Sequence, residues 1–173
     1  DDAHIFVTKD GIGETLEKLI ALVEDIYKVF GVKYKAYLST RPDDFMGEIE
    51  TWNKAEDTLK KAMEKAGLAI LLKERDGAFY GPKIDYQLED SLGRTWQCAT
   101  LQLDFQMPET FNLEYTDNDG KTQRPVMVHR TIIGSVERFV GILTEHYGGA
   151  FPAWLSPVQV KVIPVSDKVI DYA

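Results

Sequence analysis

Cysteine is nearly absent from this sequence. Among 173 residues there is a single cysteine, Cys98, so no disulfide can form within the chain, and this suits a reducing compartment. No apolar run approaches the roughly 20 residues of a membrane-spanning helix. The first residues also lack the basic and then apolar order of a secretory signal. We therefore expect a cytoplasmic protein without a membrane segment.

Positive charge is also scarce. The chain has 20 Lys and Arg against 28 Asp and Glu, a formal net charge of -8. This balance argues against broad, charge-driven binding of nucleic acid or anionic membranes by this chain alone, but it is compatible with a local phosphate pocket. No H-x-x-x-H, C-x-x-C or G-x-S-x-G pattern occurs, so neither a local metal signature nor a serine-nucleophile signature is present.

Hydrophobic periodicity predicts the elements. Apolar spacing predicts helices over residues 12–30 and 52–63, which end at Gly31 and Gly67. Alternation predicts strands over 32–38, 68–72, 84–88, 94–105, 111–115 and 125–128, with a hairpin turn at 117–120. This order predicts an α+β domain on a mainly antiparallel sheet. Residues 1–152 would form that domain, and 153–173 a linker with the first strand of another domain, beginning at Val158.

A final helix, predicted over residues 132–143, carries a conspicuous arginine. Its apolar face would consist of Ile132, Val136, Phe139, Val140 and Leu143. Arg138 lies off that face between Gly134 and Gly141, which suggests that an anion such as a phosphate comes close to the guanidinium. A solvated surface arginine on a core helix is the more common explanation of such spacing.

Two further segments have unusual polarity. In residues 94–105, one face would carry Trp96, Cys98, Thr100, Gln102 and Asp104, and the other Thr95, Gln97 and apolar residues. Buried amides and hydroxyls need partners, which a polar ligand lying on the sheet would supply, although a solvated face or sheet edge explains them equally well. Residues 77–83 offer Tyr80 and Lys83 to a ligand, or form a plain turn before a strand.

Histidine and cysteine give weaker signals. His4 and His129 each lie beside an apolar run, where a lone histidine is more often a hydrogen-bonded structural residue than a ligand. Cys98 lies within a predicted strand, and we expect a small buried apolar residue there and not a reactive thiol.

Taken together, these motifs resemble a known family. Across nearly the whole chain, and in the same order, the sequence resembles the catalytic core of threonyl-tRNA synthetases, which are class II aminoacyl-tRNA synthetases. The matching motifs are Asp1-Asp-Ala-His-Ile-Phe6, Leu38-Ser-Thr-Arg-Pro42, Gly77-Ala-Phe-Tyr-Gly-Pro-Lys-Ile84, Trp96-Gln-Cys98, Leu101-Gln-Leu-Asp-Phe105 and His129-Arg-Thr-Ile-Ile-Gly-Ser-Val-Glu-Arg-Phe139. Residues 154–160 resemble the entry to that family's anticodon-binding domain.

The resemblance implies a fold and an activity. The fold would be the class II antiparallel sheet flanked by helices. The activity would be a ligase reaction that converts threonine and ATP, with Mg²⁺, to threonyl-adenylate and then transfers threonine to tRNA(Thr). The full enzyme would be a homodimer.

The resemblance also implies residue roles. Arg138 matches the motif 3 arginine that holds the ATP phosphates and is the catalytic candidate, while Ser135 and Gln97 lie at positions near the nucleotide. Five other residues match positions around threonine, with Lys83 the weaker match: Asp2, Tyr80, Thr100, Gln102 and Lys83. His4 and His129 match two of the three protein ligands of a zinc ion that binds threonine.

Several family features are missing from this sequence. The third zinc ligand, a cysteine, would precede Asp1, and Cys98 does not replace it. Motif 1, which forms the dimer interface, and most of motif 2, with its arginine for the α-phosphate, are absent, as are the editing domain and nearly all of the anticodon-binding domain. We therefore expect a fragment that alone lacks adenylation activity and binds zinc weakly.

Two rival functions remain. One is a class II synthetase for another amino acid, such as proline or serine, against which the paired His4 and His129 argue. The other is a non-catalytic, synthetase-like module that binds a ligand or partner. The retention of Arg138 and both histidines argues against that module but does not demonstrate activity.

Overall fold

A six-stranded sheet organises the computed structural model, which describes residues 1–172. Its strands follow the spatial order β1-β8-β5-β4-β2-β3, and every neighbouring pair is antiparallel except β2 with β3. The strand bounds are β1 (Ala3–Val7), β2 (Lys33–Ser39), β3 (Leu71–Lys73), β4 (Lys83–Glu89), β5 (Thr95–Asp104) and β8 (Val126–Thr131). The predicted α+β class and mainly antiparallel sheet are thus confirmed.

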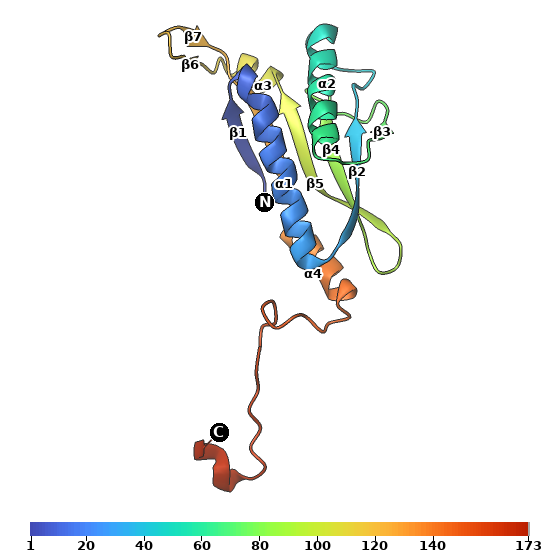
Figure 1. Ribbon diagram of the computed structural model, residues 1–173, viewed down its shortest axis with the longest axis vertical. Coiled ribbons are helices and arrows are strands. Elements are labelled where there is room, and N and C mark those ends of the chain that lie inside the picture. The colour runs from blue at the N-terminus through green and yellow to red at the C-terminus, as the bar shows by residue number, and fades with distance from the viewer. Residues whose placement is uncertain (173) are drawn as a thin grey trace.

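Two long helices cover one face of this sheet (Figure 1). They are α1 (Ile12–Phe30), which follows the short helix η1 (Lys9–Gly11), and α2 (Ile49–Lys65). Apolar residues at helical spacing, such as Leu16 and Ile20 in α1 and Leu59 in α2, are fully buried against the sheet. Gly31 ends α1 in the left-handed conformation, with φ +66°, as its sequence position predicts.

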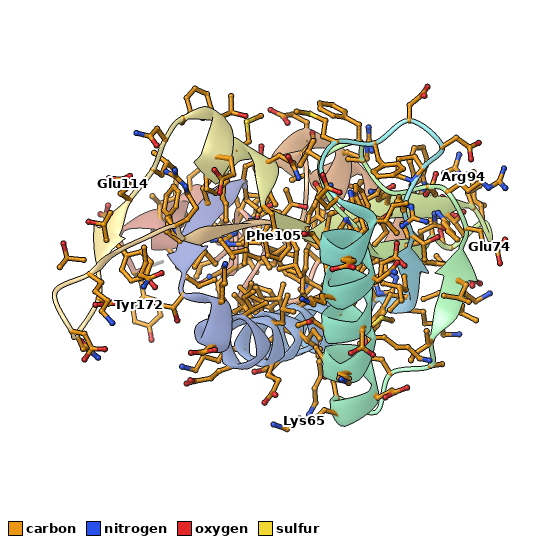
Figure 2. All side chains as sticks on the ribbon, turned by 90° about the horizontal axis from the view of Figure 1, so that it is seen from above. Lys65, Glu74, Arg94, Phe105, Glu114 and Tyr172 are labelled. Atoms are coloured by element: carbon orange, nitrogen blue, oxygen red, sulfur yellow. The ribbon has the colours of Figure 1, made fainter. Side chains whose placement is uncertain are left out.

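The outer surface of the helices is charged, and the interior is apolar. In the view from above, Lys65 lies at the end of α2 (Figure 2), whereas the core consists of fully buried residues such as Leu59 and Leu101. Lys65 Nζ is 2.7 Å from Glu17 Oε1 of α1, so an exposed ion pair joins the two helices. Exposed pairs contribute little to stability, and burial of apolar side chains holds the layers together.

The last helix begins later than predicted. Helix α4 spans Val136–His146, so the predicted start at residue 132 is wrong. Gly134 has a φ of +70°, which is not helical, so α4 cannot begin before it. Ser135 then caps α4 by accepting a hydrogen bond from the Arg138 amide. Its buried residues are Phe139, Ile142 and Leu143. Val136 and Val140, predicted on the apolar face, are 53% and 51% exposed.

The segment between β5 and β8 also differs from the prediction. Helix α3 (Gln106–Thr110) follows β5, and the strand predicted over residues 111–115 is reduced to β6 (Tyr115–Thr116), which pairs with β7 (Thr122–Gln123). The predicted turn between β6 and β7 is present, because Asp117 accepts hydrogen bonds from the amides of Asp119 and Lys121. Strand β3 is shorter than predicted and shifted along the chain.

Residues 147–155 still pack against the domain, with the Trp154 ring 5.6 Å from the Phe30 ring, and the residues after them extend away from it (Figure 1). Residues 157–164 have no regular secondary structure, and the final helix η2 covers Asp167–Tyr172. The strand predicted from Val158 is therefore not formed in the part of the chain that the structure describes, where no neighbouring strand lies beside it to pair with. The division at residue 152 stays a prediction. Among residues 1–172, no helix is long and apolar enough to cross a membrane.

Two glycines provide a matched test of this packing. A Cβ at Gly81 would overlap the carbonyl oxygen of Leu103, whereas a Cβ at Gly13, in the first turn of α1, would meet nothing within 4 Å. We expect Gly81→Ala to lower the free energy of unfolding by about 3 kcal/mol. Gly13→Ala should raise it by about 0.5–1 kcal/mol. Urea unfolding followed by circular dichroism measures both, and equal effects would contradict this packing.

Candidate active site

A cavity of about 240 Å³ opens beside strands β1, β5 and β8. The register explains its composition, because His4 pairs with His129 and His129 pairs with Gln102, which places three polar side chains in one row across the sheet. The lining residues are Asp2, Ala3, His4, Tyr80, Thr100, Gln102, His129, Arg130 and Thr131. Four of the five predicted threonine-binding residues thus meet both predicted zinc ligands in one cavity.

The two histidines are in contact. Their ring centroids lie 4.8 Å apart in an edge-to-face arrangement, with His4 exposed and His129 partly buried. Nε2 of His129 is 2.8 Å from Oδ2 of the fully buried Asp104. A hydrogen on Nε2 leaves a lone pair on Nδ1, and this carboxylate–imidazole pairing is the usual support of a metal-binding histidine. Asp104 was not among the predicted site residues.

Asp104 is itself held in place. Its Oδ1 accepts hydrogen bonds from the backbone amides of Gln106 and Met107, at 2.8 and 2.9 Å. One oxygen therefore fixes the start of α3 and the other orients the His129 ring. Within residues 1–172, no group of three or more His, Cys, Asp or Glu side chains is placed to hold a metal ion. The donor chemistry fits zinc at two positions and leaves the set incomplete.

Tyr80 and Gln102 form the floor of the cavity. The Tyr80 hydroxyl donates to Oε1 of Gln102 at 2.9 Å, and Nε2 of Gln102 donates to the Gly81 carbonyl at 3.0 Å. Burial, followed by the nearby Asp104 charge, raises the pKa of Tyr80, which keeps its hydroxyl protonated at neutral pH. Gln102 then has one N–H left to donate to a ligand.

A β-bulge in β5 changes the predicted faces. Tyr86 of β4 pairs with Ala99 and Gln87 pairs with Gln97, so Cys98 is an extra residue without a partner in β4. The prediction that Gln97 and Thr100 point to opposite faces is wrong, because Gln97 Nε2 donates to Thr100 Oγ1 at 3.1 Å. Both also contact Asp85, and so does Lys83. Neither Gln97 nor Lys83 lines the cavity.

Arg138 lies at the start of α4 with an exposed guanidinium. Its Cζ is 5.9 Å from the centroid of the Trp96 ring, near the beginning of β5. Among the described residues, no carboxylate forms an ion pair with it, so its charge is available to an anion. Ser135, predicted near the nucleotide, uses its hydroxyl to cap α4 and to donate to Glu137.

The loop before α4 is fixed by Asp1. The Asp1 carboxylate accepts hydrogen bonds from the backbone amides of Ile132, Ile133 and Gly134 and pairs with Arg130 at 3.1 Å. Three amides converging on one carboxylate fix the loop. A Cβ at Gly134 would lie 3.0 Å from the Cys98 carbonyl oxygen, so close packing explains this glycine. A Cβ at Gly141 would meet nothing within 4 Å.

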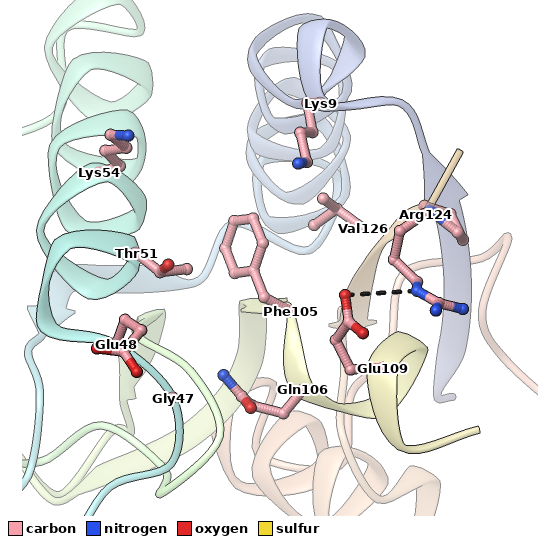
Figure 3. A pocket seen from close by; sticks show the side chains of 11 residues that line it. Lys9, Gly47, Glu48, Thr51, Lys54, Phe105, Gln106, Glu109, Arg124 and Val126 are labelled. Atoms are coloured by element: carbon pink, nitrogen blue, oxygen red, sulfur yellow. Dashed lines mark ion pairs between the residues drawn. The ribbon is translucent and has the colours of Figure 1, made fainter. Parts of the chain in front are cut away.

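A larger cavity, of about 410 Å³, lies beside the N-terminal end of α2 (Figure 3). Lys9, Lys54 and Phe105 line it, and Arg124 pairs there with Glu109 at 3.4 Å. None of the predicted site residues lines this cavity. Size alone therefore does not identify the candidate active site, which is the smaller cavity where the predicted residues converge.

The chain shares its core with known proteins. A family model described as the tRNA synthetase class II core domain (G, H, P, S and T) matches residues 1–147, and the chain belongs to this family. Individual relatives are more specific. A threonine–tRNA ligase from Acetivibrio thermocellus is 60% identical over 99% of this chain, and one from Clostridium tetani is 58% identical over all of it.

These matches cover only part of the relatives. The chain spans 27% of the length of both ligases. A crystal structure of the RNA binding domain of threonyl-tRNA synthetase from Cryptosporidium parvum Iowa II superposes with a TM-score of 0.95 at 46% identity, over 99% of this chain and 44% of that one. The resemblance inferred from the sequence motifs is thereby confirmed.

Cys98 gives a direct test of the β5 packing. Its side chain is buried, and this burial raises its pKa to about 11, although Arg138 acts in the opposite direction. At pH 8 only about one thiol in a thousand would then be ionised. We expect iodoacetamide to react with Cys98 at least tenfold more slowly in the native chain than in urea. Equal rates would contradict its burial.

Proposed function

We propose that this chain is the catalytic-core portion of a threonine–tRNA ligase, which activates threonine with ATP and transfers it to tRNA(Thr). The observation that carries this proposal is the convergence of Asp2, Thr100 and Gln102 with His4 and His129 in one cavity. The 55–60% identity to proteins named threonine–tRNA ligase supports the choice of amino acid. Because the chain spans about a quarter of those relatives, the activity would belong to the longer protein.

The cavity has groups suited to an amino acid with a hydroxyl. Asp2 is exposed at its rim and would accept hydrogen bonds from the threonine hydroxyl, while Gln102 has one N–H to donate. Thr100 lines the same space, and the Tyr80 ring lies 5.5 Å from the His129 ring. A site whose buried polar groups pair with a hydroxyl discriminates against valine, which has the same shape but leaves those groups unpaired.

Zinc is the metal whose chemistry fits the two histidines. His4 and His129 would bind it, with the His129 ring oriented by Asp104, and a third protein ligand would come from outside residues 1–172. When bound, zinc would supply a Lewis acid for the amine and hydroxyl of threonine. His129, already oriented by Asp104, would lose the least rotational freedom on binding.

The nucleotide would occupy the side of the site near α4. Arg138 has an unpaired, exposed guanidinium over Trp96, and such a fork suits the phosphates of ATP bound with Mg²⁺. Clamping these phosphates favours in-line attack of the threonine carboxylate on the α-phosphate. Gln97, beyond the β-bulge, would contact the adenylate, and Ser135 would act mainly by setting the start of α4.

The remaining partners belong to the longer protein. We propose a cytoplasmic homodimer whose other domains bind tRNA(Thr). The isolated 173-residue chain should then be inactive in adenylation, because only one half of the phosphate clamp and two zinc-binding side chains are present.

The proposal is tested by threonine-dependent pyrophosphate exchange. In the longer protein, we expect Arg138→Ala to lower kcat/KM by about 100-fold or more, the usual cost of removing a group that stabilises developing charge. Arg75→Ala removes an exposed arginine that does not line the cavity and, among residues 1–172, pairs only with the exposed Asp43, and it serves as the matched control. The isolated chain should show no exchange.

The outcomes separate the rival functions. Exchange driven by proline or serine in place of threonine would identify a class II synthetase for another amino acid. Threonine binding without any exchange by the longer protein would identify a non-catalytic module. Exchange by the isolated chain would refute its expected inactivity.

Zinc content gives an independent test. In the longer protein, we expect His129→Ala and His4→Ala each to lower the bound zinc, measured by atomic absorption, and to reduce discrimination between threonine and valine. Asp104→Asn should weaken zinc binding by about 10-fold, since it changes the partner of His129. Unchanged zinc content in both histidine variants would contradict this assignment.

A further inference from the structure

Asp85 is a fully buried carboxylate that no sequence pattern indicated as part of the site. It lies on β4, where it pairs with Thr100 of β5, and its side chain belongs to the polar face of the sheet. A buried charge is costly unless it is paired and hydrogen-bonded, so its partners explain why it is there. Three of those partners are predicted ligand-binding residues.

Each oxygen of Asp85 accepts two hydrogen bonds. Oδ1 accepts from Gln97 Nε2 at 2.7 Å and from the Thr100 hydroxyl at 2.9 Å. Oδ2 accepts from the Lys83 ammonium at 2.9 Å and from the Ser39 hydroxyl at 3.0 Å. A carboxylate has about four lone-pair sites, and all of them are used here. Asp85 therefore has no capacity left for a ligand and acts only through its neighbours.

The orientation of Gln97 follows from these contacts. Its Nε2 donates one hydrogen to Asp85 Oδ1 and the other to Thr100 Oγ1. Both amide hydrogens are committed, so Oε1 is the group that Gln97 presents to the exposed side of the sheet. The Thr100 hydroxyl hydrogen is committed as well, because it points to Asp85. Gln97 is thereby set to accept a hydrogen bond from a hydroxyl or ammonium group of a ligand.

The charge of Lys83 is compensated by the same carboxylate. Its side chain is 16% exposed, and the backbone of Lys83 pairs with Gln102, which lines the cavity. Lys83 thus presents N–H donors without a net local charge. Loss of the Asp85 charge would leave a mostly buried ammonium unpaired and would free the Gln97 amide hydrogen that Asp85 accepts.

We propose that Asp85 is a positioning residue of the site, which holds Lys83, Gln97 and Thr100 in the arrangement that meets threonine and ATP without itself touching them. This inference rests on the proposed ligase function and extends it. The same four hydrogen bonds that satisfy a buried charge give the three side chains one arrangement before a ligand arrives.

The test compares Asp85→Asn and Asp85→Glu in the longer protein by pyrophosphate exchange. Asn has the shape of Asp, but its NH₂ group replaces one of the two acceptor oxygens. Two of the four surrounding donors would then face another donor and lose their hydrogen bonds. We expect Asp85→Asn to lower kcat/KM by about 100-fold, the usual cost of misplacing a binding group by about 1 Å. Glu keeps the charge and all acceptor sites, and its kcat/KM should remain within about tenfold of the parent.

Coupling to Gln97 distinguishes positioning from loss of folding. We expect Asp85→Asn combined with Gln97→Ala to cost much less than the product of the two single losses, because both changes remove the same arrangement. Tyr147→Phe removes a hydrogen bond from the Tyr147 hydroxyl to the Phe30 carbonyl, far from the site, and should lower the melting temperature while KM for ATP and threonine stay unchanged.

The failures are distinguishable. No threonine-dependent exchange by the parent protein would refute the proposed ligase function. An active parent with an Asp85→Asn variant of equal kcat/KM would refute the positioning role and leave the function intact. Strictly multiplicative losses in the double variant, or a loss that tracks only the folded fraction seen for Tyr147→Phe, would also overturn it.

Discussion

The site depends on one irregularity in the sheet, the extra residue at Cys98 of β5. The bulge turns Cys98 into the core and moves Gln97 to the polar face beside Thr100. It also exposes the Cys98 carbonyl oxygen to two neighbours, since the Thr131 hydroxyl donates to it and Gly134 packs against it. A single inserted residue therefore sets both the face that would bind the ligand and the place where the chain turns toward α4. Bulges commonly re-aim side chains in this way beside active sites.

Three aspartates then give the surrounding groups fixed orientations. Asp85 holds Lys83 and Gln97, Asp104 orients His129, and Asp1 fixes the loop that leads to Arg138. Each shares its oxygens among several donors, and in two of the three cases these include backbone amides. Such contacts hold side chains in place before binding, which reduces the ordering cost that a ligand would otherwise meet.

Much of the fold follows from periodicity, while the organisation of the site follows from register. The bounds of α1 and the antiparallel sheet were predictable because apolar residues recur at helical or strand spacing over many positions. The motifs also indicated which residues converge in the cavity. Strict alternation failed at Gln97, because no residue type marks a bulge at Cys98. Periodicity also extended α4 back to Ile132, which is buried but lies in the preceding loop. The roles of Asp1, Asp85 and Asp104 depend on partners across strands, which the order of residues does not reveal.

The contact between Asp1 and Gly134 has a kinetic consequence. Its partners are separated by 133 positions, and the pairing of His4 with His129 also joins distant parts of the chain. Such contacts form only after a long loop has closed, and loop closure costs entropy before any contact repays it. The hairpin of β4 and β5, with its local contacts, can form early. We therefore expect the polar face around Asp85 to assemble before the histidine pair, so that the last step of folding is also the step that completes the cavity.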